Sequence, residues 1–338
     1  MKKALLFSTL AAFAFVAPAQ AQSDFYAGKR ITIIVGSESG GGYDTHGRIM
    51  SRHFGRFLSG NPTIIVQNMP GAGSIVATNY LANVAPKDGT FLGIIQRTML
   101  TAKVARMEGV QFDPMQINWV GNLTTETGMV VSWHNHPVKT AQDLYQHELI
   151  VGGAGVAADT EATPRLLAHV LGMKFKVVSG YRGNTNILLA LENGEIGGVG
   201  DWAWPNIKTR RPDFLRDRKI NLIMQLGLEK LEDAPADIPL VMDFAKTEDD
   251  RKVLQLYFAQ KQVARPVMAP PGVSPERMKE LRTAFNAMVK DPDAVADAIR
   301  SGVEISATTS EDVSKVMALI AATPPHIADR LAEAIKPR

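Results

Sequence analysis

The sequence contains no cysteine among its 338 residues. Disulfide bonds, thiolate metal sites and cysteine nucleophiles are therefore excluded. A chain of this length buries enough apolar surface to fold without covalent cross-links, and it exceeds what one hydrophobic core usually serves. We therefore expect a disulfide-free protein with two domains.

The chain also lacks an apolar run of the ~20 residues that a membrane-spanning helix needs. Its first 21 residues form a shorter pattern: Lys2 and Lys3 precede an apolar stretch over residues 4–16, and small residues follow at Ala19 and Ala21. This arrangement is typical of a secretory signal peptide. We predict residues 1–21 to be a signal peptide cleaved after Ala21, and the mature protein to be exported with no membrane span of its own.

A strong net charge is absent as well. The formal charge is +3, and Lys2 and Lys3 of the predicted signal peptide contribute two of these charges. A nearly neutral mature protein lacks the basic surface that nucleic acids or anionic membranes attract. We expect neither of them as a partner.

The most informative stretch is the glycine-rich segment 39–44, which follows an apolar strand pattern over residues 31–35. Apolar residues at helical spacing come next, so we expect a helix that begins near Asp44, with Asp44 as its N-cap. A strand–glycine–helix turn points unpaired backbone N–H groups at the space above the helix N-terminus, which favours an anion there. A tight turn that binds nothing is an equally good interpretation of this stretch alone.

Two more strand patterns, over residues 63–66 and 91–95, complete a strand–helix alternation. Such alternation predicts a parallel sheet with right-handed crossovers, in which ligands bind beyond the carboxyl ends of the strands. Three loops are expected to converge at that edge of the sheet, namely 37–44, 69–74 and 96–98.

A second α/β unit follows, with strand patterns over residues 148–151, 175–178 and 196–199 and with small or polar residues after each strand. Its loops are expected to face those of the first unit across a cleft. A strand over residues 263–268 is predicted to return to the first unit and to pair beside the strand near Val130.

The fold class that we predict is therefore α/β, with two lobes and a central ligand cleft. The first lobe is predicted to be discontinuous, over residues 22–127 and 262–338. The second lobe is predicted to cover residues 128–261.

Patterns of catalytic or cofactor-binding proteins are incomplete in this sequence. Residues 153–158 match a dinucleotide fingerprint, but no acidic residue follows about 20 positions later. The glycines at 40–42 are not followed by the Lys-Ser/Thr of a phosphate-binding loop, and no Gly-x-Ser-x-Gly motif occurs. His134 and His136 lack the helical spacing of a zinc-binding pair. We expect no enzymatic activity, no cofactor and no metal.

Motifs spread over the chain resemble the tripartite tricarboxylate transporter receptor family, also called Bug or TctC receptors. The glycine loop at 40–44 resembles the opening loop of that family, and 68–73 together with 85–90 resembles its "N-x-P-G-A-G … A-x-P-D-G-Y" signature. The resemblance continues through residues 151–155 and 180–183 and ends at 268–273.

The resemblance implies a periplasmic solute receptor with the type II, two-lobed periplasmic-binding-protein fold. Such a receptor closes on a small organic carboxylate, held largely by backbone amides, and delivers it to the permease subunits of a tripartite membrane transporter. Carried over by motif, the expected ligand-binding residues are Ser37, Glu38, Ser39, Gly40, Gly41, Gly42, Tyr43, Asp44, Gln96, Arg97, Thr98, Gly153, Ala154, Gly155, Val156, Ala157, Tyr181, Arg182, Gly183, Asp201 and Trp202.

Three of these side chains have alternative interpretations. Glu38 departs from the family pattern and places a carboxylate beside an expected anion site, so it points away, pairs with a basic residue or meets a ligand amine. Arg182, between glycines at a strand end, is either a surface residue or a bidentate partner for a carboxylate. Trp202 fits a hydrophobic cleft wall and core packing equally well.

We therefore expect a monomeric binding protein without catalysis. An extracytoplasmic sensor that signals to a membrane partner would use the same cleft, and the sequence does not separate it from a transport receptor. An exported α/β hydrolase would need a nucleophile–base pair, for which the sequence offers no candidate. The identity of the carboxylate also stays open.

Overall fold

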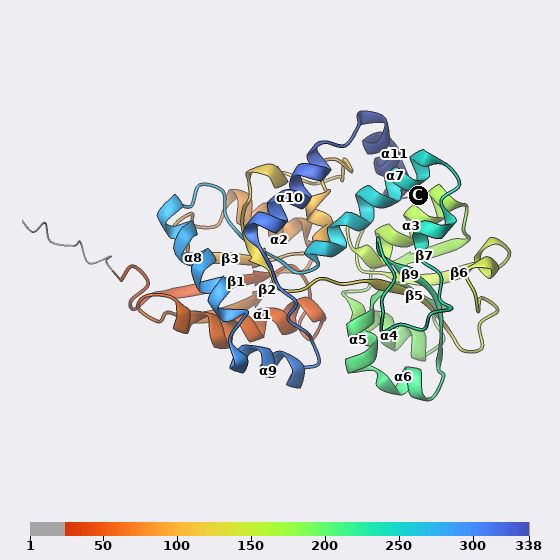
Figure 1. Ribbon diagram of the computed structural model, residues 1–338, viewed down its shortest axis with the longest axis horizontal. Coiled ribbons are helices and arrows are strands. Elements are labelled where there is room, and N and C mark those ends of the chain that lie inside the picture. Colours follow the sequence, from red (N-terminus) through yellow and green to blue (C-terminus); the bar gives the residue numbers. More distant parts are fainter. Residues whose placement is uncertain (1–23, 338) are drawn as a thin grey trace, which may run out of the picture.

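The computed structural model describes residues 24–337. The predicted signal peptide therefore lies outside the described residues. Figure 1 shows two α/β bodies side by side, each built around one sheet and flanked by helices. The predicted alternation of strands and helices is present in both bodies.

The first sheet has six strands in the order β11-β4-β10-β3-β1-β2. Its strands are β1 (Arg30–Val35), β2 (Thr63–Asn68), β3 (Phe91–Ile94), β4 (Asn118–Asn122), β10 (Pro266–Ala269) and β11 (Thr308–Thr309). The pairs β1–β2 and β1–β3 are parallel, as predicted, whereas β10 runs antiparallel to its two neighbours.

The second sheet has five strands in the order β7-β6-β8-β5-β9. They are β5 (Gly128–Trp133), β6 (Leu149–Gly153), β7 (Phe175–Ser179), β8 (Gly198–Ala203) and β9 (Ile220–Leu226). Here β6 pairs in parallel with β7 and β8, and β5 runs antiparallel to β8 and β9.

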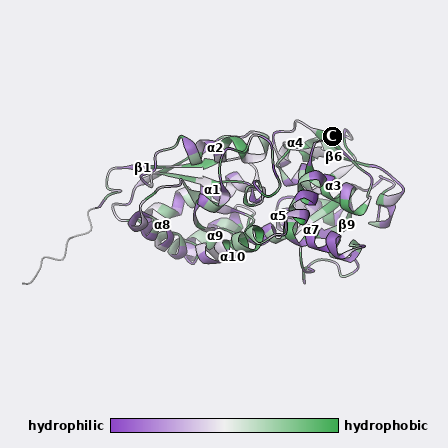
Figure 2. Cartoon of the chain, turned by 90° about the horizontal axis from the view of Figure 1, so that it is seen from above, coloured by the Kyte–Doolittle hydropathy of each residue, from purple (hydrophilic) through white to green (hydrophobic). Residues whose placement is uncertain are grey.

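Helices cover the sheets and carry both hydrophilic and hydrophobic segments (Figure 2). They are α1 (Gly42–His53), α2 (Ile75–Asn83), α3 (Asp159–Leu171), α4 (Asn184–Glu192), α5 (Trp204–Arg210), α6 (Pro212–Arg216), α7 (Glu248–Ala259), α8 (Pro275–Met288), α9 (Pro292–Arg300), α10 (Ser310–Ala321) and α11 (Pro325–Ile335). Their apolar sides enter the core, as Leu281 and Phe285 of α8 do beneath the first sheet.

Two segments carry the chain between the sheets, residues 123–127 after β4 and residues 260–265 before β10. We call them the crossing segments. The predicted pairing of the returning strand near Val130 is wrong. Val267 instead pairs with Gly121 of β4 and Ile94 of β3, whereas Val130 of β5 pairs with Met224 of β9 in the second sheet.

The C-terminal helices lie against both bodies. Helix α10 packs on β4 of the first sheet, whereas α11 packs on α3 and α7 beside the second. Ile327 and Leu331 of α11 share a hydrophobic cluster with Leu167 of α3, which explains this placement. The predicted lobe boundaries at 127 and 262 stay a prediction.

Strand β8 of the second sheet extends further along the chain than predicted. It extends through Asp201 and Trp202, which the sequence placed in the following loop. Pairing of Trp202 with Met129 of β5 continues the ladder to that point. The Trp202 side chain is 2% exposed and stands edge-on to Phe214, with the ring centroids 6.0 Å apart. Core packing is therefore part of its role.

We predict that Trp202→Ala lowers the free energy of unfolding by about 3–5 kcal/mol, because truncating a buried tryptophan removes contacts and leaves a cavity. Urea denaturation measures this loss, with Trp202→Phe as the milder companion. A variant that unfolds like the wild type would contradict the packing role.

Candidate functional site

The glycine loop leads into α1 as expected, but its local geometry differs from the prediction. Helix α1 begins at Gly42, with Gly41 rather than Asp44 as the N-cap. Asp44 lies in the first turn, where its carboxylate accepts hydrogen bonds from the Gly40 amide (2.9 Å), Arg48 Nε (2.8 Å) and Asn68 Nδ2 (2.9 Å). The Asp44 carboxylate therefore stabilises the loop by linking it to α1 and β2.

The positive backbone angle in this loop belongs to Gly40, whose φ is +88°. Gly41 has φ −77°, which any residue adopts, and a Cβ there would meet only Glu38 O at 3.9 Å. The amides of Gly42 and Tyr43 belong to the first turn of α1. The N–H groups in the first turn of a helix have no acceptor within that helix. Within residues 24–337, neither amide donates to another group.

A cavity of about 60 Å³ lies between the two sheets at the N-terminus of α1. Eleven predicted site residues line it, namely Ser37, Glu38, Gly41, Gly42, Tyr43, Gln96, Arg97, Ala154, Arg182, Gly183 and Asp201. The other ten are not among the lining residues; these are Ser39, Gly40, Asp44, Thr98, Gly153, Gly155, Val156, Ala157, Tyr181 and Trp202. The ligand-binding role of both groups stays a prediction.

Several of the non-lining residues instead join the two bodies. Thr98 Oγ1 donates to the carbonyl oxygen of Ala157, and Arg210 Nη1 donates to that of Gly40 (2.8 Å). Gly73, with φ +65°, lies so close to the opposite loop that a Cβ would be 2.3 Å from the Ala158 amide.

The cavity of about 60 Å³ is smaller than the about 300–1,000 Å³ of usual ligand pockets. The two bodies must therefore separate somewhat to admit a ligand.

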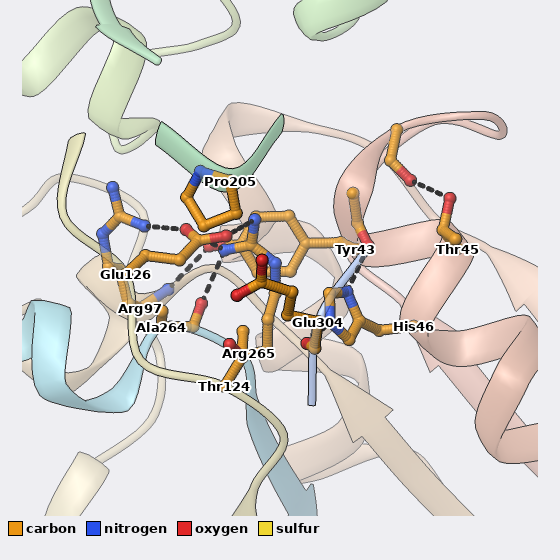
Figure 3. Close-up of polar contacts among 12 residues, drawn as sticks. Tyr43, Thr45, His46, Arg97, Thr124, Glu126, Pro205, Ala264, Arg265 and Glu304 are labelled. Carbon is orange, nitrogen blue, oxygen red and sulfur yellow. Dashed lines mark hydrogen bonds and ion pairs between the residues drawn. The ribbon is translucent and has the colours of Figure 1, made fainter. Parts of the chain in front are cut away.

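A buried ionic network forms one side of the cavity (Figure 3). Glu126, on the first crossing segment, lies between two guanidinium groups. Arg97 Nη1 is 3.1 Å from Glu126 Oε2, and Arg265 donates to both carboxylate oxygens, from Nη1 (2.8 Å) and Nη2 (2.6 Å). The guanidinium of Arg265 also covers the Tyr43 ring at 4.0 Å.

The network continues into the second body. Asp201 of β8 accepts from Lys261 Nζ at 2.8 Å on both oxygens and from Thr163 Oγ1 at 2.8 Å. Arg97 pairs with Asp159, the first residue of α3, and lies 3.5 Å from Asp201. Three carboxylates thus balance three cationic groups.

Burial and charge oppose each other in the pKa values of this network. Burial disfavours the ionised Asp201, but Lys261 and Arg97 outweigh it and lower the pKa of that carboxyl. For Asp159, burial outweighs the attraction of Arg97, so its pKa is raised. The pKa of Lys261 is lowered by burial and by the nearby Arg97.

Sequence reasoning found Arg97 and Asp201 but missed Glu126, Asp159, Lys261 and Arg265. Glu126, Lys261 and Arg265 lie on the two crossing segments, far apart in the sequence and outside every motif. Both crossing segments are rich in polar residues, so no local signal distinguished these three charged side chains.

Glu38 and Arg182 approach each other from opposite bodies. A Cβ on Gly183 would lie 2.5 Å from Glu38 Oε1, so the carboxylate faces the second body rather than pointing away. Burial raises the pKa of Glu38, and the positive charge of Arg182 partly opposes that effect. Arg182 is exposed and makes no hydrogen bond to another described residue.

We predict that Lys261→Met lowers the free energy of unfolding by about 3–5 kcal/mol at neutral pH, because it leaves Asp201 buried without its ammonium partner. In the wild type, the lowered pKa of Asp201 gives stability above the carboxyl's unfolded pKa that is lost as the pH falls through the folded value. In the variant, burial raises that pKa, so the difference from the wild type should shrink at mildly acidic pH.

Urea unfolding at the two pH values measures this effect. Lys315→Met, which removes an exposed pair with Asp312, is the matched control and should change little. Equal losses in the two variants would contradict a special role for the buried pair.

Two absences concern the described residues alone. Residues 24–337 contain no group of three or more His, Cys, Asp or Glu side chains that could hold a metal ion. None of the helices in this range is long and apolar enough to span a membrane.

The sequence was compared with known protein families and with curated proteins. Residues 55–214 match the model of the tripartite tricarboxylate transporter family receptor. A UPF0065 protein from the gbd 5′ region of Cupriavidus necator is 26% identical over 284 residues, which is 82% of this chain and 79% of that protein. A UPF0065 protein of Bordetella pertussis is 23% identical over 93% of this chain and 94% of its own length.

Solved structures confirm the predicted two-lobed α/β fold. The periplasmic binding protein BugD aligns with a TM-score of 0.71 at 17% identity, over 91% of this chain and 98% of BugD. MatC from Rhodopseudomonas palustris with bound malate aligns with a TM-score of 0.68 at 21% identity, over 91% and 99% of the two chains. An R. palustris protein with adipate, Rpa4515, aligns with a TM-score of 0.69 at 17% identity, over 90% of this chain and 97% of its own.

Proposed function

We propose that this chain, which belongs to the tripartite tricarboxylate transporter receptor family, captures a small organic carboxylate between its two bodies and delivers it to a membrane permease. The structures of MatC with malate and of the adipate-bound protein support a carboxylate as the ligand class. The periplasm is the proposed place of action, and no catalytic step is proposed.

One observation carries this proposal: unpaired hydrogen-bond donors surround the cavity. The amides of Gly42 and Tyr43 lie at the positive end of the α1 dipole, which favours an anion. In addition, Nε of Arg97 and Nε of Arg265, two residues that line the cavity, are buried without an acceptor among the described residues. Each of these donors gains a partner if a carboxylate enters the cavity.

Closure of the two bodies is the proposed mechanism. A ligand favours the closed state only through contacts that are absent in the open state, so it must touch both bodies. The cavity meets this condition, because α1 comes from the first body and Arg182, Gly183 and Ala154 come from the second. The closed shape is then the form that a permease would recognise.

Thermal-shift screening against carboxylic acids tests the function directly. A ligand at 100 times its dissociation constant stabilises the folded state by about 2.7 kcal/mol and so raises the melting temperature. Stabilisation by one or more acids is the expected result. If no acid of a broad panel shifts the melting temperature, the proposed function is wrong.

We predict that Arg182→Ala weakens carboxylate binding by about 1.5–3 kcal/mol, the range for a hydrogen bond to a charged group. Arg182 lines the cavity without a hydrogen-bonding partner of its own, so its guanidinium is available to a ligand. Titration calorimetry measures the change. Unchanged affinity in a variant that keeps its melting temperature would make Arg182 a surface residue only.

The glycine loop offers a matched pair of variants. Gly41→Val should abolish binding with little loss of stability, because Gly41 lines the cavity at an ordinary φ and the added side chain obstructs the ligand. Gly40→Val should lower stability, because φ +88° disfavours a β-branched residue. Calorimetry and thermal melting separate the two effects, and intact binding by Gly41→Val would reduce this loop to a turn.

A further inference from the structure

The charges around the cavity balance one another. Four carboxylates line it, those of Glu38, Glu126, Asp159 and Asp201, and three guanidinium groups do so, those of Arg97, Arg182 and Arg265. Lys261, paired with Asp201 just behind the lining, supplies the fourth positive charge. The site is therefore electroneutral before any ligand arrives.

Electroneutrality disfavours a ligand with two uncompensated negative charges. A buried charge is costly unless an opposite charge or several hydrogen bonds compensate it. The N-terminus of α1 contributes the equivalent of roughly half a positive charge, which suits one carboxylate better than two. A ligand that carries its own positive charge keeps the balance.

The side-chain oxygen of Gln96 lacks a hydrogen-bond donor in the described part of the chain. Gln96 is 7% exposed and lines the cavity, yet no donor among residues 24–337 reaches its Oε1. Its backbone amide is held by Ser74 Oγ at 3.1 Å, so the main chain at this point is fixed. Whichever way the amide is turned, its oxygen needs a hydrogen-bond donor, and an occupant of the cavity is the group that can supply one.

Glu38 is the lining carboxylate without an ion pair. Glu126, Asp159 and Asp201 each have a cationic partner within 4 Å, whereas Glu38 has none among the described side chains. With its amide nitrogen turned toward the carboxylate, Asn186 donates to Glu38 Oε2 at 2.9 Å, but no described cationic group pairs directly with Glu38, and Arg182 offsets its charge only from a greater distance. A cationic group in the cavity would compensate it.

We infer that the ligand carries a protonated amine beside its carboxylate, and that Gln96 and Glu38 select it over plain carboxylic acids. This inference rests on the proposed carboxylate-binding function. The ligand carboxylate meets the amides of α1 and the free guanidinium nitrogens, while the ammonium donates to Gln96 Oε1 and faces the Glu38 carboxylate.

Two pairs of acids that differ in the amine test the inference by titration calorimetry. Succinate is compared with aspartate, and butyrate with 2-aminobutyrate. The amine-bearing member of a pair should bind at least about tenfold more tightly. Plain acids that bind as tightly as their amino counterparts would overturn the inference.

Different binding results would overturn the inference and the proposed function. If none of the four acids binds, the inference falls, whereas the proposed function falls only if the broad carboxylic acid panel also contains no binder. Plain acids that bind well without their amino counterparts would support the function and overturn the inference.

Variants identify the selecting residues. Gln96→Met keeps the side-chain volume and removes the acceptor, and Glu38→Gln removes the charge; each should reduce the preference for the amine about tenfold. Glu148→Gln, at an exposed second-body site away from the cavity, should leave the preference unchanged. If Gln96→Met fails to fold, Glu38→Gln alone decides, and an unchanged preference in the folded variants would overturn the assignment.

Discussion

The carboxylate of Glu126, held between Arg97 and Arg265, is the interaction on which the rest of the site depends. It joins three segments that are distant in sequence: the short 3₁₀ helix Arg97–Leu100 after β3 and the two crossing segments. Removing one partner of a buried pair leaves an uncompensated charge at a cost of about 3–5 kcal/mol. The network therefore forms as a unit and fixes the connection between the two bodies.

This constraint is compatible with the proposed anion site, although many charges surround that site. The charged side chains of the network already compensate one another, so we propose that a ligand is recognised by the backbone amides of α1, the spare guanidinium nitrogens and the loops of the second body. Buried pairs are screened little by salt. We therefore expect the geometry of the glycine loop, rather than a strong positive field, to position the ligand carboxylate.

The sequence was sufficient to predict the parallel strands and the convergence of their loops, because apolar runs and glycine turns are local signals. The N-cap was misassigned because Asp44 lies inside the first turn of α1, where it pairs with Arg48 one turn later and with Asn68 of β2. The pair with Asn68 depends on the fold, so no local rule reveals it. Trp202 lies in β8 because pairing with β5 extends that strand. Glu126 and Arg265 are 139 positions apart, so their pairing depends on the fold and not on any motif.

The central claim is that a carboxylate binds between the N-terminus of α1 and this ionic network. A crystal structure of the protein with its tightest-binding acid tests it most directly. The account predicts carboxylate oxygens within hydrogen-bonding distance of the Gly42 or Tyr43 amide, with the Glu126 pairs intact. A ligand bound instead in the cavity lined by Trp204, Lys208 and Leu231, on the other side of Glu126 and Lys261, would contradict it.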